Sequence, residues 1–288
     1  MKRQFSISMV LAALALFPLS GCIIIADFDP WDSDCKVWID GNEERVSLEA
    51  DGLNSVDVKT HSGAVTFTGA TNDDTFVTYR VRAGARSSED AQRALDAVEV
   101  FVDRGNDGVA RLGWRWNQMK RSSWSASVSF KVNAPSDCDL EVETHNGPVT
   151  VTSLRGDADL ETHNGAITVE TTGHRLSAQT HNGSITASFA GRDVTLETHN
   201  GRIAADLSGC GTVDGHIVTH NGGVNVTLGD GASTMVRAST YNGGITCLAP
   251  IQDSQIERRR LTGRIGSGEG SLTINTHNGG VRIDKKQG

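Results

Sequence analysis

Apolar and polar residues alternate in short runs over most of the chain, and this alternation recurs with a fixed period. In the unit from Asp157 to His174, single polar residues separate the apolar side chains on both sides of a turn. A period of two predicts two short β-strands, each with one buried face. Because units of 18–21 residues are typical of repeat architectures, we expect a mainly β fold of about eight coils.

Equivalent apolar positions form three columns through the units. The column ahead of the turn consists of Val142, Leu160, Ala178, Leu196, Ile217, Ala238 and Ile274. The first column after the turn consists of Val149, Ile167, Ile185, Ile203, Val224, Ile245 and Val281. The second consists of Val151, Val169, Ala187, Ala205, Val226, Cys247 and Ile283. These columns are the predicted core of a repeat array that we place at residues 135–288.

The turn of each unit carries the tetrapeptide Thr-His-Asn-Gly or a close variant. Its histidines are His145, His163, His181, His199, His220 and His277, with near-copies of the turn at His61 and Tyr241. Its Asn-Gly pairs are Asn146-Gly147, Asn164-Gly165, Asn182-Gly183, Asn200-Gly201, Asn221-Gly222, Asn242-Gly243 and Asn278-Gly279. The 36 residues from Tyr241 to His277 are twice the period of 18. We therefore predict a degenerate coil between them, at Leu261–Gly266.

Two architectures fit this turn. Glycine adopts a positive φ without steric cost, and Asn-Gly is a strong signal for a hairpin that joins two antiparallel strands. An antiparallel β-meander would use every turn in that way. In a β-solenoid each unit is instead one coil, and equivalent residues stack about 4.8 Å apart. Identical residues at every turn favour the solenoid, because stacked Asn side chains can form a hydrogen-bonded ladder.

The N-terminus has the features of a targeting segment. Residues 1–21 combine Lys2 and Arg3 with an apolar run too short to span a bilayer, which is typical of a signal peptide. The sequence Leu19-Ser20-Gly21-Cys22 resembles a bacterial lipobox, and this resemblance implies cleavage before Cys22 and lipidation of its thiol. Ile23, in place of Asp, implies by the same resemblance an outer-membrane location in a Gram-negative bacterium. The lipid could lie in the periplasmic or in the surface-facing leaflet. We interpret residues 22–54 as a lipid-anchored tether.

Residues 55–134 contain one repeat-like strand pair and then depart from the pattern. The departure predicts a small α+β layer, with a short helix whose N-terminal cap lies in Ser87–Asp90. Such a layer would cover one open end of the stack, where unpaired strand edges invite aggregation. Trp114, Trp116 and Trp124 belong to this layer. They share faces with aliphatic residues, which indicates core, although an exposed aromatic patch for a glycan or a partner is the other interpretation.

Charge and cysteine content restrict the possible partners. The formal net charge is −8 without a polybasic run, which argues against nucleic acid. An exported compartment permits disulfides, and three pairings are possible among Cys35, Cys138, Cys210 and Cys247. Cys247 lies in an apolar column, so we predict a buried free thiol there.

A lipobox, an opening β segment, a strand-helix-strand insert and repeated Thr-x-Asn-Gly-x-Ile-x-Val units resemble a known group. It is the bacterial putative-adhesin family of unknown function, whose members look like β-solenoids. The resemblance runs from about Ser55 to Ile283 and includes Leu261–Gly266 and Leu272-Thr273-Ile274, which look like the family's C-terminal coils. It implies a solenoid but supplies no site residue, and a His in nearly every turn goes beyond the family's pattern.

The histidine column is the candidate site. His163 has the same strand phase as Glu161, so the column is expected to face solvent beside Glu143, Glu161, Gln179 and Glu197. Neighbouring imidazoles could chelate Zn²⁺ or Cu²⁺ between adjacent coils, or they could simply be a turn residue copied with the repeat. No nucleophile elbow or phosphate loop is present, and Arg258, Arg259 and Arg260 form the only basic cluster.

The leading hypothesis is therefore a non-enzymatic, lipid-anchored envelope protein. Its repetitive surface would bind a protein or a polysaccharide, for adhesion or for structure. A metal-binding or metal-sensing protein that uses the histidine column is the alternative. Catalysis is not expected, since a solenoid polysaccharide lyase would need acidic residues around a cation near a basic side chain, and fold alone does not imply function.

Overall fold

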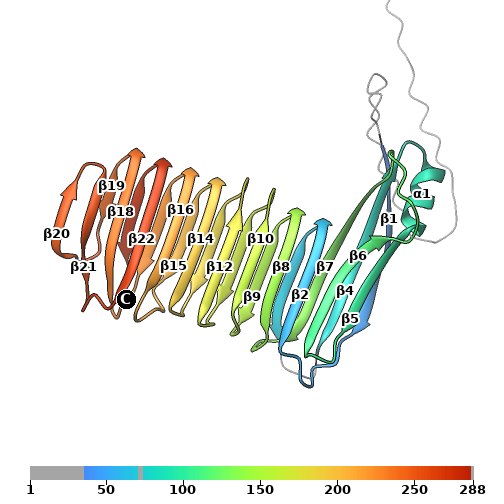
Figure 1. The fold of residues 1–288 in the computed structure, drawn as a ribbon, viewed down its shortest axis with the longest axis horizontal. Coiled ribbons are helices and arrows are strands. Elements are labelled where there is room, and N and C mark those ends of the chain that lie inside the picture. Colours follow the sequence, from blue (N-terminus) through green and yellow to red (C-terminus); the bar gives the residue numbers. More distant parts are fainter. Residues whose placement is uncertain (1–35, 71–73, 287–288) are drawn as a thin grey trace, which may run out of the picture.

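The computed structural model describes residues 36–70 and 74–286, and within them it contains one helix and two large mixed β-sheets. The body is elongated, with the N-terminal layer at one end and the hairpin β20–β21 at the other (Figure 1). The prediction of a mainly β fold is confirmed. The predicted signal peptide, Cys22 and Cys35 lie outside the described residues, so their predictions stay predictions.

The two sheets, which we call sheet A and sheet B, run along the whole body. In spatial order, sheet A contains β1 (Val37–Ser47), β4 (Phe76–Ala85), β7 (Ser125–Pro135), β3 (Val65–Ala70), β9 (Val149–Leu154), β11 (Ile167–Thr171), β13 (Ile185–Phe189), β15 (Ile203–Leu207), β17 (Val224–Leu228), β23 (Val281–Lys285) and β19 (Ile245–Cys247). Sheet B contains β20 (Gln252–Glu257), β21 (Arg260–Ile265), β18 (Thr234–Asn242), β22 (Gly270–Asn278), β16 (Asp214–Asn221), β14 (Asp193–Asn200), β12 (Arg175–Thr180), β10 (Ala158–Thr162), β8 (Asp139–Asn146), β2 (Ser55–Ser62), β6 (Val109–Trp116) and β5 (Val98–Arg104).

Each repeat unit contributes one strand to sheet B and, after the Asn-Gly corner, one strand to sheet A; we call this unit a coil. Equivalent residues of successive coils pair in parallel, as Leu160 does with Ala178 in sheet B and Ile167 with Ile185 in sheet A. Parallel pairing is compatible with a solenoid. The antiparallel meander is wrong for this array, because the two strands joined by each Asn-Gly corner lie in different sheets.

The three apolar columns meet between the two sheets. Their side chains are buried throughout the array, except that Ile245 and Cys247 of the short edge strand β19 are half-buried. The largest buried side chains include Phe67, Phe130 and Phe189. Alternation along each strand therefore places one apolar set inside and one polar set outside, as the period of two predicts.

The last two coils are exchanged in space relative to their order in the sequence. Strand β22 pairs with β16 on one side and with β18 on the other. The final coil therefore lies between the two coils that contain β16 and β18. In sheet A, β23 likewise lies between β17 and β19. Sequence periodicity cannot detect this exchange, because any coil presents the same columns to either neighbour.

The prediction of a degenerate coil at Leu261–Gly266 is wrong. This segment forms β21, which pairs antiparallel with β18 and with β20. A coil would need one strand in each sheet, whereas β20 and β21 form a hairpin that belongs to sheet B alone. The hairpin covers the exposed edge of β18, and only its all-exposed strand β20 is left at the end of sheet B.

The N-terminal layer continues both sheets beyond the first coil. Strand β6 pairs in parallel with β2, and β7 pairs in parallel with β3, so β6 and β7 are placed like a further coil. Strands β4 and β1 then add antiparallel to sheet A, and β5 adds to sheet B. The predicted tether over residues 22–54 is therefore too long, because residues 37–47 form β1 and Ile39 is buried in this layer.

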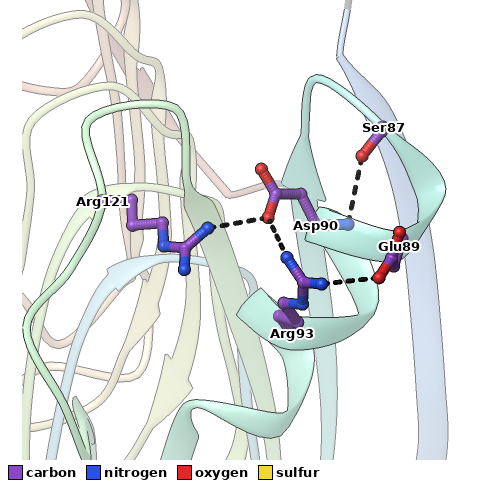
Figure 2. Close-up of polar contacts among 5 residues, drawn as sticks. All are labelled: Ser87, Glu89, Asp90, Arg93 and Arg121. Atoms are coloured by element: carbon purple, nitrogen blue, oxygen red, sulfur yellow. Dashed lines mark hydrogen bonds and ion pairs between the residues drawn. The ribbon is translucent and has the colours of Figure 1, made fainter.

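Helix α1 (Ser88–Asp96) begins as the sequence predicts, at the cap Ser87. The Ser87 hydroxyl accepts a hydrogen bond from the Asp90 backbone N–H at 3.2 Å. Arg93 and Arg121 both pair with the Asp90 carboxylate, at 3.3 and 3.0 Å (Figure 2). The other side of the helix buries Ala91 and Ala94. Cap, ion pairs and buried alanines together fix the helix against the sheet.

The three tryptophans form a contact chain at this layer. Trp124 is 2% exposed, whereas Trp114 and Trp116 are half-buried. Ring centroids lie 5.6 Å apart between Trp114 and Trp116 and 5.7 Å apart between Trp116 and Trp124. The core interpretation is therefore confirmed for Trp124, while Trp114 keeps part of its surface in solvent.

Candidate binding groove

The repeated threonine ties each coil to the one beside it. Its side chain points inward and is buried in every coil, and from Thr162 onward its hydroxyl donates to the carbonyl of the glycine in the neighbouring corner. The donor–acceptor distance is 2.9 Å from Thr180 to Gly165 and 2.9 Å from Thr198 to Gly183. Thr144, at the junction with the first coil, has a buried hydroxyl without a partner. The threonine thus satisfies a carbonyl that a turn would otherwise leave unpaired.

The repeated glycine is required for a reason other than the predicted one. Positive φ occurs at Gly63 in the first coil, but not at the Asn-Gly glycines of the array, so that prediction is wrong for them. Instead, the backbones approach so closely that a Cβ on Gly183 would lie 1.8 Å from the Gly165 carbonyl oxygen. The corresponding separation is 1.8–2.0 Å for the glycine of every other Asn-Gly pair in the array. Stacking of coils, not turn conformation, excludes a side chain.

The repeated asparagine forms the predicted ladder. The Asn182 side-chain amide donates to the Asn164 carbonyl oxygen at 2.8 Å, and its own oxygen accepts from Asn200 at 2.8 Å. The ladder runs from Asn146 to Asn242, with Asn278 inserted between Asn221 and Asn242. These amides are exposed. The ladder therefore sets the register of the corners at the surface.

The histidine rings stack along the outside of sheet B. In spatial order the stack, which we call the His ladder, contains His61, His145, His163, His181, His199, His220, His277 and Tyr241. Neighbouring ring centroids are 4.7–5.0 Å apart, and their planes differ by 1–5°. Parallel strands in register produce this spacing, since adjacent strands lie about 4.8 Å apart.

A groove runs beside the His ladder and across the strands. Its first stretch, of about 650 Å³, is lined on one side by the five ladder histidines from His163 to His277. On the other side lie Glu161, Gln179, Glu197, Val218 and Asn275, and the inward-pointing threonines form the floor. A second stretch shares Glu161 and His163 with the first and continues past Glu143 and Lys59 to Trp114. We call the two stretches together the ladder groove.

The ladder groove is predominantly acidic on the wall opposite the histidines. Glu143, Glu161 and Glu197 lie in this wall, and Lys59 is the one cation in its described lining. Asp57, with smaller contributions from Glu141 and Glu143, raises the pKa of Lys59, so this amine is held in its charged form. Lys59 also lies 3.5 Å from Glu141. The groove therefore has a charged end near the N-terminal layer and more neutral groups toward Asn275.

Sequence reasoning placed the six predicted histidines and their Asn-Gly corners in one row, but it missed both ends of that row. His61 belongs to the ladder, and its turn Thr60-His61-Ser62-Gly63 was a visible signal. Tyr241 lies next to His277, because the last two coils are exchanged. Trp114 reaches the groove through β6, and its indole N–H donates to the Thr60 hydroxyl at 3.1 Å. No repeat pattern includes Trp114.

Metal ligation does not follow from the ring geometry alone. Within residues 36–70 and 74–286, no group of three or more His, Cys, Asp or Glu side chains is placed to hold a metal ion. Imidazole lone pairs lie in the ring plane, and the planes of stacked rings run parallel. A zinc ion about 2.0–2.1 Å from one nitrogen could not reach the next ring without rotation of a side chain. Zinc or copper binding by the ladder stays a prediction.

The other reactive groups are separate from the groove. Cys138, Cys210 and Cys247 are free, and Cys138 and Cys210 are buried, whereas the predicted burial of Cys247 is only partial. Burial raises the pKa of Cys138 to about 12 and that of Cys210 to about 11, so both thiols are protonated at neutral pH. The basic cluster Arg258–Arg260 lies exposed where β20 turns into β21. In the described part of the chain, no helix is long and apolar enough to cross a membrane.

No family model and no curated protein matches this chain. Among solved structures, it is similar to a putative adhesin from Bacteroides fragilis NCTC 9343, with a TM-score of 0.46 and 12% identity over 84% of this chain and 97% of that chain. It is also similar to a putative cell adhesion protein from Clostridium sporogenes ATCC 15579, with a TM-score of 0.36 and 11% identity over 85% and 99% of the two chains. A putative adhesin from Parabacteroides distasonis ATCC 8503 gives a TM-score of 0.36 and 11% identity over 85% and 96%. Scores of this size carry no argument about function.

Proposed function

We propose that this protein is a non-enzymatic, lipid-anchored β-solenoid of the bacterial envelope whose function is to bind a macromolecule along a repetitive surface. The observation that carries the proposal is the His ladder with the groove beside it. Seven imidazoles and the phenol ring of Tyr241, at 4.7–5.0 Å spacing, present polar groups at regular intervals along one line. Such a row suits a long partner better than a small one, because each coil adds an equivalent contact.

The rest of the fold supports a display role. Ladders of threonine and asparagine hold every coil in register, so the exposed side chains have fixed positions. The N-terminal layer and the β20–β21 hairpin lie at the two ends of the array. The hairpin covers the edge of β18 in sheet B, while sheet A ends in the three-residue strand β19. Covered or short edges are less able to pair with other chains. The exposed surface between them is then free for a partner.

The anchor and the binding surface can be tested in one preparation. We expect wild-type protein to sediment with the outer-membrane fraction and the Cys22→Ser variant to become soluble, because the lipid is the proposed anchor. Sedimentation of the unlipidated variant with membranes would contradict the anchor.

For the surface, immobilised protein is mixed with envelope extract. The variant with His163, His181 and His199 each changed to Gln should lose the captured material. The matched control changes Thr150, Thr168 and Thr186 to Ala; these residues form a stacked outward column on sheet A in three successive coils. Equal capture by both variants and by wild type would place the binding surface elsewhere.

Metal binding by the His ladder is the second candidate function. The observation that favours it is the row of seven imidazoles. If two neighbouring rings rotated, their nitrogens could bind the same ion. Isothermal titration with Zn²⁺ and Cu²⁺, on wild type and on the His163, His181 and His199 to Gln variant, decides between the two functions. Tight metal binding that the substitutions abolish would favour the metal-binding function. If no heat of binding is observed with either ion, that function is excluded.

A further inference from the structure

We propose that the ladder groove binds a neutral, linear, polyhydroxylated polymer, that is, an uncharged linear glycan lying along the long axis of the array. This inference rests on the proposed function of a macromolecule-binding surface and names the chemical class of the partner. Four features of the groove carry it: the way the imidazoles are presented, the charge of the opposite wall, the direction of the groove, and the aromatic rings at its ends.

The stacked imidazoles offer their edges and not their faces. Each ring face inside the ladder is covered by the next ring at 4.7 Å, so stacking on a ligand is blocked there. A neutral imidazole carries one N–H donor and one nitrogen acceptor in the plane of its ring. A hydroxyl group is likewise both a donor and an acceptor. The His ladder is therefore a row of mixed donors and acceptors, which matches a row of hydroxyl groups.

The acidic wall opposite the histidines disfavours negatively charged polymers. Glu143, Glu161 and Glu197 accept hydrogen bonds and repel anions, while Gln179 and Asn275 both donate and accept. The net charge of −8 acts in the same direction over longer range. Nucleic acids and acidic glycans are thereby disfavoured. The carboxylates, two of which flank the Gln179 amide, still accept the hydroxyl hydrogens of a neutral sugar chain.

The direction of the groove disfavours a peptide. A peptide strand gains affinity by adding to the edge of a sheet through its backbone, but the strands under this groove already pair on both sides. The groove also runs across these strands, with contacts every 4.7–5.0 Å. An extended peptide advances about 3.2–3.4 Å per residue, so its groups fall out of step with the ladder.

Aromatic rings lie at the N-terminal end of the groove and just beyond its other end, where Tyr241 stacks on His277. Half-buried Trp114 lines the N-terminal end, held by its hydrogen bond to Thr60. At the other end Tyr241 is the last ring of the ladder and is 62% exposed. The apolar face of a sugar ring can pack on such a surface, because an aromatic ring buries a large area at a small entropic cost. Seven ladder steps separate the two ends, which suits an oligomer and not a single sugar.

The experiment measures binding of glycans to the purified full chain by isothermal titration and affinity electrophoresis, with EDTA present to remove metal ions. The probes are neutral linear α- and β-linked glucans and N-acetylated chitin oligosaccharides, each as a length series, with polygalacturonate as the acidic comparison. We expect affinity for at least one neutral series to rise with chain length, and no binding of polygalacturonate.

The decisive variant changes His163, His181 and His199 to Phe, which keeps a stack of rings but removes every donor and acceptor from three rungs. It should weaken glycan binding about tenfold or more, since each lost hydrogen bond contributes to affinity. The Thr150, Thr168 and Thr186 to Ala variant is the control and should bind like wild type. A second variant, Tyr241→Ala, should reduce affinity for the longest oligomers more than for short ones.

Four results would overturn the inference. Preference for polygalacturonate would reverse the charge argument, and glycan binding unchanged by the Phe variant would place the site elsewhere. If no neutral glycan binds, while wild type but not the Phe variant captures an envelope protein, the glycan is wrong and the proposed binding function stands. If neither glycan nor envelope material binds, both proposals fall together.

Discussion

The close approach of glycine backbones makes a sharp prediction about neighbouring residues in one corner. A Cβ on Gly222 would lie 1.8 Å from the Gly201 carbonyl oxygen, whereas a Cβ on Gly223 would meet its nearest atom at 3.4 Å. The two glycines are adjacent, and neither has a positive φ. Gly222→Ala and Gly223→Ala therefore make the same chemical change at sites that differ mainly in available space.

The expected cost follows from the contacts at that corner. Real Cβ contacts are essentially never shorter than 3.0 Å, so Gly222→Ala must move the backbones apart by more than 1 Å. The movement strains the bond from Thr219 to Gly201 at 2.9 Å and the bond from Thr276 to Gly222 at 2.8 Å. Overpacking costs about 1–3 kcal/mol, and each weakened hydrogen bond adds about 0.5–1.5 kcal/mol. We expect a total loss of about 2–6 kcal/mol.

Gly223→Ala should be neutral or slightly stabilising, because an alanine restricts the unfolded chain where the folded backbone accepts it. Urea unfolding followed by circular dichroism compares the two variants with wild type. At a dependence of about 1–3 kcal/mol per molar urea, the Gly222→Ala midpoint should fall by about 1 M or more. If the two variants unfold at the same urea concentration, coil stacking is not what requires the glycine.

Four further predictions concern the asparagine and threonine columns and the buried cysteines. Asn182→Ala removes two exposed amide hydrogen bonds of 2.8 Å and should cost about 1 kcal/mol by urea unfolding; an unchanged midpoint would mean that the ladder adds no stability. Thr198→Val keeps the shape but leaves the Gly183 carbonyl unpaired, so a loss of about 1–3 kcal/mol is expected, and a stability equal to wild type would contradict the role of that bond. Cys138 and Cys210 should resist maleimide at pH 8 in the native protein and react with it in urea. Mass spectrometry identifies which cysteines are labelled. Burial raises their folded pKa values to about 12 and 11, so between about pH 9 and 11 the unfolded thiols ionise while the folded thiols stay largely protonated. Stability should therefore decline as pH rises from about 9 toward 12, and Cys138→Ala should reduce that slope.

Local pattern was sufficient for the elements of the array. Alternation predicted which side chains are buried, and the cap at Ser87 predicted where α1 begins. Both depend on neighbours in the sequence, so the sequence contains the whole signal. The histidine row could also be predicted, because a fixed period places equivalent residues one strand spacing apart whenever the strands pair in register.

The pattern misled where one residue type serves two purposes. Glycine after asparagine suggested a positive φ, yet the corners of the array need glycine because the next coil's carbonyl occupies the place of a Cβ. Similarly, Leu261–Gly266 resembled a coil but forms an antiparallel strand. Its alternation fits any half-buried strand, and the partner strand decides the direction.

The sequence by itself determined the strands, their buried faces and the row of identical turns, since these follow from periods of two and of 18–21 residues. Only the tertiary structure decided that the final coil inserts between β16 and β18, which brings Tyr241 next to His277. Only it placed Trp114 at the other end of the groove. The reason is physical: repeated coils present interchangeable surfaces, so their order in space depends on how the chain closes its ends and not on any local preference.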